Sequence, residues 1–294
     1  MPRRRLVLTA DSADIDNALA QLRAQLDIRD HYPPAALTEA TKAANTPLPA
    51  PGEVGSGTPP RPAVPILDAR DVPLVTVDPE TSRDLDQAAA LERIPGGYRL
   101  HYAIACLAFF VDPKAELDQE THRRATTVYG PGHAIGLHPD VIAAGAGSLL
   151  PAVDRLAYLW RIDISEEGTI LDADVAPALV RSRAQLSYTQ VQAALDARAP
   201  AAPLGAIAAH APSSAPQPLP AQVPADFAEL LAAFGRARLS AERARGGISL
   251  DIPEQRIVPA ATGYALAYRS NVPVESYNAQ LSLTCGIAAA QMMR

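Results

Sequence analysis

The chain has 294 residues, 48% of them hydrophobic, a length that allows one large domain or two of ordinary size. Its net charge of −6 and its pI near 5.5 exclude a protein that coats nucleic acid through bulk positive charge. No apolar run approaches the ~20 residues that span a bilayer, and Cys106 and Cys285 show no C-x-x-C spacing. We expect a soluble, cytoplasmic, monomeric protein without a disulfide framework, a zinc site or membrane contact.

The first 30 residues predict a small N-terminal element. Residues 6–9 form a short apolar run typical of a strand, and apolar side chains recur at helical spacing over residues 12–26. Residues 31–71 are rich in proline, alanine, glycine and threonine, a composition typical of a semi-rigid linker. We therefore expect the main domain to occupy residues 72–294.

Strands and helices are predicted along the whole main domain. Strand patterns occupy residues 74–77, 87–94, 98–105, 156–164, 170–180, 256–258 and 264–268. Helical patterns occupy residues 117–127, 187–195 and 226–245, and a last helix runs from residue 274 onward. Ser187 is suited to cap the second helix, and Gly246 and Gly247 stop the third. Residues 199–224 are rich in proline, alanine and serine and predict a mobile surface insertion.

The last predicted helix shows no stop signal. Residues 287–294 contain no glycine cap, no proline and no polar tail. We therefore expect the domain to be incomplete at its C-terminus.

Three aspartates between two predicted strands form the most informative segment. Asp78 ends the first strand, and Asp84 and Asp86 lead into the second, so an intervening turn would bring their carboxylates together. Hard cations such as Mg²⁺ take oxygen ligands, and phosphodiester hydrolysis uses such ions. A solvated acidic turn explains the same spacing equally well, because aspartate is common in turns.

Other motifs are excluded by the residues themselves. In a calcium-binding loop starting at Asp78, Arg83 would occupy the glycine position and Ala89 the terminal glutamate position. The sequence also lacks a phosphate-binding G-x-x-x-x-G-K loop, a G-x-S-x-G elbow and an H-E-x-x-H pair. Nucleoside triphosphate hydrolysis, a serine hydrolase triad and zinc peptidase chemistry are therefore unsupported.

The acidic segment closely resembles the RNB family of hydrolytic 3′→5′ exoribonucleases, the ribonuclease II and ribonuclease R family. The signature of that family is a strand ending in Asp, followed by an R-D-x-D-D run, and the matching residues are Asp78, Arg83, Asp84 and Asp86. Further matches follow in order at residues 97–105, 117–118, 123–129, 148–151 and 154–157, and a weaker one at residues 273–278. The resemblance covers the chain from residue 72 to its end and is densest over residues 77–164.

With the predicted elements, the resemblance implies an α+β fold: a mixed, largely antiparallel sheet with surrounding helices. It also implies degradation of single-stranded RNA from the 3′ end to nucleoside 5′-monophosphates, with Mg²⁺ held by Asp78, Asp84 and Asp86. Gln87 stands at the fourth acidic position of the signature and can offer a carbonyl oxygen to a metal, although not a charge.

Four residues are candidates for RNA contact. Tyr129 matches a family tyrosine that stacks near the 3′-terminal bases, although a buried packing tyrosine is the alternative. The arginines Arg83, Arg123 and Arg124 are candidates for phosphate contacts, although exposed arginines commonly serve only as solvated surface.

Departures from the family pattern leave a second interpretation open. Gln87 would weaken a second metal site, Cys106 replaces a usual aspartate, and no S-P-I-R-R-Y arginine precedes Arg294. These departures favour a catalytically impaired RNB domain that serves as an RNA-binding or scaffold module. A small-molecule metal phosphoesterase uses similar carboxylates, and only the length of the family match disfavours it.

Overall fold

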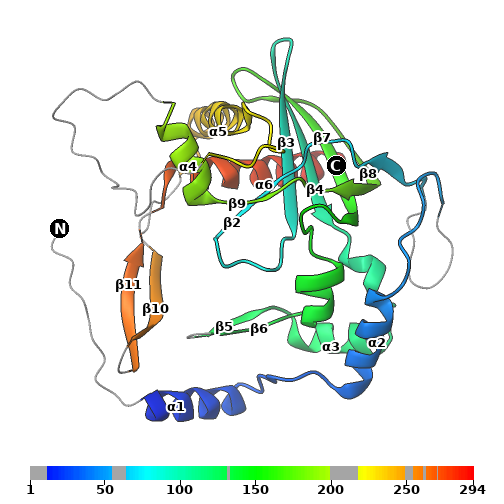
Figure 1. Cartoon of the computed structure of the whole chain (residues 1–294), viewed down its shortest axis with the longest axis vertical. Coiled ribbons are helices and arrows are strands. Elements are labelled where there is room, and N and C mark those ends of the chain that lie inside the picture. Colours follow the sequence, from blue (N-terminus) through cyan, green and yellow to red (C-terminus); the bar gives the residue numbers. More distant parts are fainter. Residues whose placement is uncertain are drawn as a thin grey trace.

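The structure is a computed structural model that describes residues 12–54, 64–130, 133–198, 218–248, 254–260, 263–269 and 271–294 (Figure 1). The strand predicted at residues 6–9 and most of the insertion predicted at residues 199–224 lie outside the described residues. Among the described residues, no helix is both long enough and apolar enough to cross a membrane.

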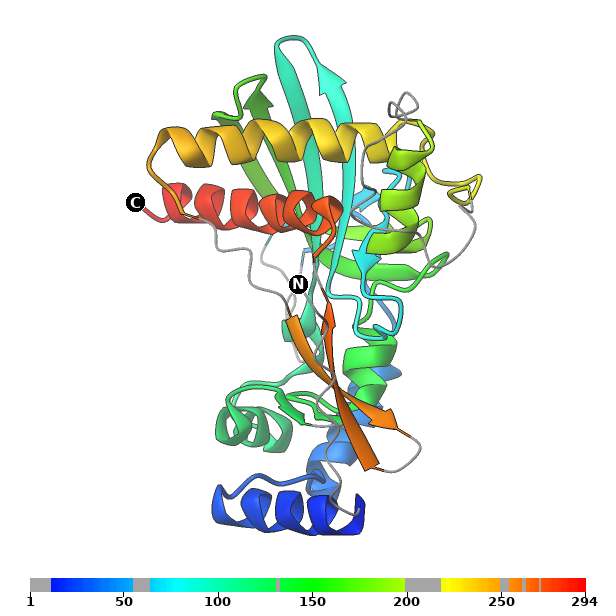
Figure 2. The same cartoon turned by 90° about the vertical axis from the view of Figure 1, so that its left-hand side faces the viewer.

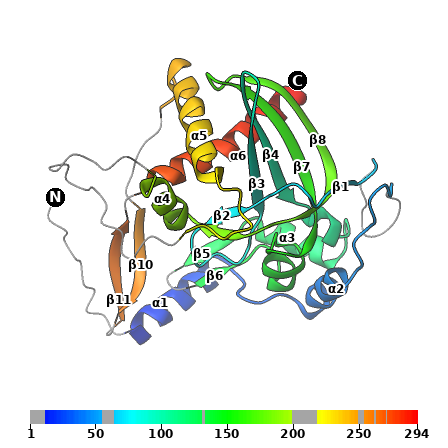
Figure 3. The same cartoon turned by 45° about the horizontal axis from the view of Figure 1, so that its top comes forward.

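A five-stranded sheet forms the centre of the molecule (Figure 3). Its strand order is β1 (Leu67–Ala69), β8 (Ile170–Arg181), β7 (Asp154–Ser165), β4 (Gly97–Ala105) and β3 (Gln87–Ile94). β1 pairs with β8 in parallel, and the other pairs are antiparallel. Helices surround this sheet, so the predicted α+β fold with a mixed, largely antiparallel sheet is confirmed.

The two faces of the sheet are buried against different partners. Successive side chains of a strand point to opposite faces, so Leu100 and Tyr102 of β4 join the cluster beneath the helices while Ala103 joins the opposite cluster. The helices on the first face are α5 (Phe227–Ala244) and α6 (Pro273–Met292), which run side by side across the strands (Figure 2).

Close strand pairing in the sheet depends on one glycine. The turn between β3 and β4 has Gly96 at φ +79°, followed by Gly97 at the start of β4. A Cβ at Gly97 would lie 1.9 Å from the carbonyl oxygen of Ile164, so only glycine allows β7 to approach here.

The region predicted as a linker contains ordered elements. Helix α2 (Pro34–Ala44) packs with Ala36 and Ala40 fully buried, and β1 pairs with β8 of the main sheet. The linker prediction for residues 31–71 is therefore wrong in these two places. Proline suits the first turn of a helix and alanine has the highest helix propensity, so a Pro/Ala-rich composition also encodes a small packed helix.

A second part of the molecule surrounds a cluster of buried residues at one end of the sheet. The cluster includes Phe109, Phe110 and Leu117, contributed by the 3₁₀ helix Leu107–Phe110 and by α3 (Glu116–Arg124). Helix α3 ends before residue 127, because Ala125 adopts φ 61° and the following β-branched residues favour extended structure. Helix α1 (Ser12–Gln25) lies at the far end of the molecule from α5 (Figure 2).

The remaining elements are short, and β2, β9 and α4 among them lie beside the site described below. The structure contains β2 (Thr76–Asp78), β5 (Val128–Gly130), β6 (His133–Ile135), the π-helical turn Ile142–Ala146, β9 (Gln185–Ser187), α4 (Tyr188–Asp196), β10 (Glu254–Ala260) and β11 (Gly263–Arg269). Ser187 caps α4 as predicted, in a capping box with Gln190. In the predicted insertion, Leu219 and Val223 pack against the cluster beneath α5.

Candidate functional site

The acidic loop, residues 78–86, joins β2 to β3 and carries the three predicted aspartates. β2 pairs in parallel with β9, which places Asp78 beside Ser187. The loop turns through a hydrogen bond from the Ser82 N–H to the Pro79 carbonyl at 2.9 Å. The loop therefore leaves the two-stranded sheet of β2 and β9 and enters the five-stranded sheet at β3.

A buried serine holds the far end of the acidic loop. Leu85 is fully buried, and its N–H donates to Ser148 Oγ at 3.0 Å. The Ser148 hydroxyl in turn donates to the Arg83 carbonyl at 3.0 Å. With Leu85 anchored, Asp84 and Asp86 on either side of it remain exposed.

The three carboxylates lie close enough to interact electrostatically. Burial and the negative charges of Asp84 and Asp86 raise the pKa of Asp78 to about 6. Partial desolvation of its carboxyl group and the charge of Asp84 also raise the pKa of Asp86, although the residue as a whole is exposed. The Oδ2 atom of Asp78 is buried and has no hydrogen-bond partner among the described residues. The loop therefore concentrates negative charge, which makes it costly to keep these carboxylates ionised.

The acidic loop supplies carboxylate oxygens, which suit a divalent cation, but the three carboxylates do not surround a single point. No three acidic, histidine or cysteine side chains in the described part of the chain are placed to hold a metal ion together. The close convergence predicted for the three aspartates is therefore not found. Carboxylate oxygens are nevertheless the ligands that Mg²⁺ prefers, and the unpartnered Asp78 Oδ2 fits that chemistry.

A small polar cavity lies beside Asp78. Its volume is about 80 Å³, and it is lined by Val75, Val77, Asp78, Gln87, Ala88, Ala89, Tyr102, Tyr188 and Asn278. Asn278 of α6 donates to the Val77 carbonyl at 3.4 Å and hydrogen-bonds the Tyr188 phenol. The sequence analysis did not identify Tyr102, Tyr188 or Asn278 as site residues. No signal in the sequence distinguished Tyr102, because β4 also contains Tyr98, Arg99 and His101.

Gln87 contacts Tyr102, one of the residues that the sequence analysis did not identify. The Tyr102 hydroxyl donates a hydrogen bond to Gln87 Oε1, the oxygen that the sequence analysis assigned to a metal. The predicted metal contact of Gln87 remains a prediction, now with a competing partner for the same atom.

Tyr129 lies on the surface, in the hairpin of β5 and β6. It pairs with Ala134 across the hairpin and is 78% exposed. This exposure disagrees with the alternative of a buried packing tyrosine and leaves both faces of a ring available for stacking.

The three candidate arginines have different surroundings. Arg83 is exposed on the acidic loop. Arg123 and Arg124 both pair with Glu120, which is 1% exposed. Arg124 also donates to the carbonyls of Gly136 and His31, at 3.3 and 2.7 Å, so its guanidinium joins α3 to β6 and to the N-terminal segment. RNA contact by these arginines stays a prediction.

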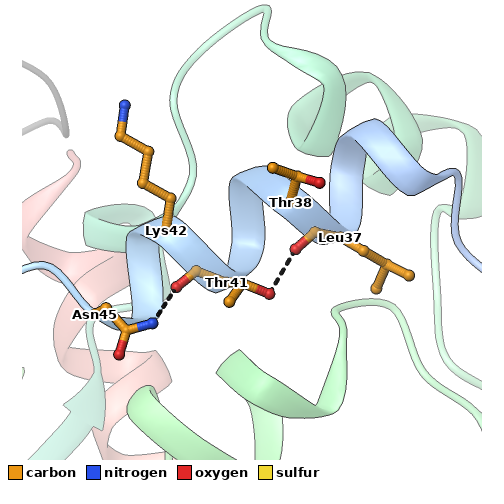
Figure 4. A pocket seen from close by; sticks show the side chains of 5 residues that line it. All are labelled: Leu37, Thr38, Thr41, Lys42 and Asn45. Carbon is orange, nitrogen blue, oxygen red and sulfur yellow. Dashed lines mark hydrogen bonds between the residues drawn. The ribbon is translucent and has the colours of Figure 1, made fainter.

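A larger hollow along α2 offers no comparable chemistry. It has a volume of about 430 Å³ and is lined by Leu37, Thr38, Thr41, Lys42 and Asn45 (Figure 4). Its polar groups bond back to their own helix, Thr41 to the Leu37 carbonyl at 2.8 Å and Asn45 to the Thr41 carbonyl at 2.7 Å. No carboxylate lines it.

The mixed sheet and the acidic loop define an α+β domain with a carboxylate-rich site between its strands. The chain belongs to the RNB domain family, whose pattern matches residues 66–293. Among similar proteins, ribonuclease R of Vibrio parahaemolyticus is 35% identical over 182 residues, which are 62% of this chain and 21% of that protein. The chain thus spans about a fifth of that relative's length.

Two further relatives carry opposite descriptions. DIS3-like exonuclease 2 and inactive exonuclease DIS3L2, both of Arabidopsis thaliana, are each 36% identical over 144 residues, 49% of this chain and 14% of each protein. Among solved structures, Mycoplasma genitalium RNase R in complex with ribose-methylated single-stranded RNA has a TM-score of 0.70 at 22% identity. It covers 90% of this chain and 38% of its own, and at that identity it supports the fold alone.

Proposed function

We propose that this chain carries the cation-binding half of a hydrolytic 3′→5′ exoribonuclease domain, which degrades single-stranded RNA to nucleoside 5′-monophosphates with Mg²⁺. The observation that carries the proposal is the half-buried Asp78 carboxylate: its Oδ2 has no hydrogen-bond partner among the described residues, and burial together with Asp84 and Asp86 raises its pKa to about 6. Membership of the RNB domain family and similarity to ribonuclease R support RNA as the substrate.

In this proposal, five of the predicted residues are divided between the cation and the RNA. When bound, Mg²⁺ would polarise the phosphoryl group and stabilise the leaving oxygen. Asp78, Asp84 and Asp86 would hold it, with the unpartnered Oδ2 of Asp78 as one ligand. The exposed ring of Tyr129 would stack on a base, and the exposed Arg83 on the same loop would contact phosphate.

The proposed setting is the reducing cytoplasm, with the protein as a monomer and single-stranded RNA as its partner. Cys106 and Cys285 are both buried and form no disulfide, as in proteins of a reducing compartment. Cys106 packs in the cluster with Phe109 and Phe110, which agrees with its interpretation as a small buried residue.

The test is an RNA degradation assay on the protein expressed from its natural reading frame. A 5′-labelled single-stranded RNA should shorten from its 3′ end with Mg²⁺ and stay intact with a chelator. Chromatography should identify nucleoside 5′-monophosphates as the product. Release of nucleoside 3′-monophosphates, or equal degradation with the chelator, would contradict the proposal.

A catalytically impaired RNA-binding module is the second candidate function. The absence of a closed three-residue metal cluster in the described part of the chain favours it, as does the engagement of Gln87 by Tyr102. RNA binding without any degradation in the same assay would select this candidate.

A further inference from the structure

The hydrogen bond between Tyr102 and Gln87 orients a side chain at the edge of the acidic loop. Tyr102 lies on β4 with 4% of its surface exposed, whereas Gln87 begins β3 and is exposed. The phenol donates to Gln87 Oε1 from the buried side. A carboxamide is planar, with its oxygen and its nitrogen on different sides, so this contact turns the amide N–H groups towards the exposed side of Gln87.

The surroundings of the phenol fix its role as the donor. The carboxamide oxygen of Gln87 can only accept a hydrogen bond, so the Tyr102 hydroxyl is the donor of this pair. Ser282 of α6 also hydrogen-bonds this phenol. The phenol carries one proton, and that proton is directed at Gln87.

We infer that Tyr102 positions Gln87 as a hydrogen-bond donor to an RNA phosphate rather than as a metal ligand. The inference rests on the proposed function for the identity of the substrate. A neutral amide beside three carboxylates adds no charge for a cation, whereas its N–H groups match a phosphate oxygen. Gln87 thus contacts substrate, and Tyr102 is a positioning residue.

The test measures binding without turnover, on Gln87→Ala, Tyr102→Phe and the double variant. Calorimetric titration with Mn²⁺ should give Gln87→Ala a dissociation constant within about two-fold of wild type, whereas Asp86→Ala should bind at least about ten-fold more weakly. In chelator, Gln87→Ala should bind single-stranded RNA at least about ten-fold more weakly, as expected for one lost hydrogen bond to a charged group.

The double variant separates positioning from a general structural role. Tyr102→Phe should weaken RNA binding about as much as Gln87→Ala does, and should have no further effect once Gln87 is absent. Tyr98→Phe, on the same face of β4, is the matched control and should bind RNA as wild type does. Additive losses in the double variant would overturn the positioning role.

The other possible results distinguish a failure of the inference about Gln87 from a failure of the proposed activity. Loss of Mn²⁺ affinity in Gln87→Ala would make Gln87 a ligand and overturn the inference, even if the wild-type protein degrades RNA. RNA affinity unchanged by Gln87→Ala would overturn it equally. A protein that passes these binding tests but never cleaves RNA would keep the inference and refute the proposed activity.

Discussion

Keeping the half-buried carboxyl group of Asp78 ionised costs free energy, and a bound cation would reduce that cost. Its pKa is raised from an ordinary value of 3.8 to about 6 by burial and by Asp84 and Asp86. A raised carboxyl pKa favours folding at low pH, and this contribution is lost as pH rises from about 4 to above 6. After allowing for partial hydration, the difference between these two pKa values corresponds to roughly 2 kcal/mol of unfolding free energy lost at neutral pH.

Asp78→Asn should therefore stabilise the metal-free chain. In the absence of divalent ions at pH 8, the variant is expected to unfold with a free energy roughly 2 kcal/mol above wild type, because it has no charge to desolvate. At pH 4 the two should be equal. Urea unfolding at both pH values checks this, and a wild type equal to or more stable than the variant at pH 8 would refute the account of Asp78.

Tyr129 should contribute to RNA affinity but not to stability. Its ring is 78% exposed, so Tyr129→Ala removes little packing. Base stacking is worth ~1–3 kcal/mol, so RNA affinity should fall roughly ten-fold or more in Tyr129→Ala and stay near wild type in Tyr129→Phe. Fluorescence anisotropy with a labelled single-stranded RNA measures both. Equal affinity for the alanine and phenylalanine variants would remove Tyr129 from the RNA path.

At the scale of elements, the acidic loop depends on neighbours that are remote in sequence. Ser148 bonds two groups of the loop, the Leu85 N–H and the Arg83 carbonyl. From the other side, α6 supplies Asn278 against the Val77 carbonyl at the end of β2. The loop thus takes its shape from contacts with separate elements rather than from its own turn alone.

Ser148→Ala should loosen the acidic loop. The substitution leaves the buried Leu85 N–H without its acceptor, an unpaired group that costs ~1–3 kcal/mol. We expect lower stability by that amount and faster amide exchange over residues 83–86, measured by hydrogen–deuterium exchange. The matched control is Ser240→Ala on the exposed side of α5, which should change neither quantity. Exchange over the loop equal to wild type would exclude Ser148 as its anchor.

At the scale of the whole molecule, period-two and helical patterns predicted most of the central elements. β3 was predicted with its observed bounds, and α6 begins at Pro273, one residue before its predicted start. These elements bury a face along their whole length, so the pattern is strong. Helix α2 was missed, because Ala36 and Ala40 are buried through small side chains that give little apolar signal.

The candidate site was predicted only where its residues are adjacent in sequence. The aspartates stand within nine positions of one another, so the strand–turn–strand pattern placed them on one loop, although their carboxylates do not surround a single point. Tyr102 and Asn278 reach the same site through strand register and helix packing. A strand pattern predicts which face a side chain occupies but not which element covers it, so their contribution required the structure.

The central claim, that the acidic loop supports RNA hydrolysis through a bound cation, is tested most directly at Asp86. The measurement is the single-turnover rate at which a 5′-labelled single-stranded RNA is shortened with Mg²⁺, by wild type and by Asp86→Asn. We predict a rate roughly a thousand-fold lower in the variant, because losing one ligand removes several kcal/mol of transition-state stabilisation, with RNA affinity within a few-fold of wild type. Comparable rates for the two proteins would contradict the account.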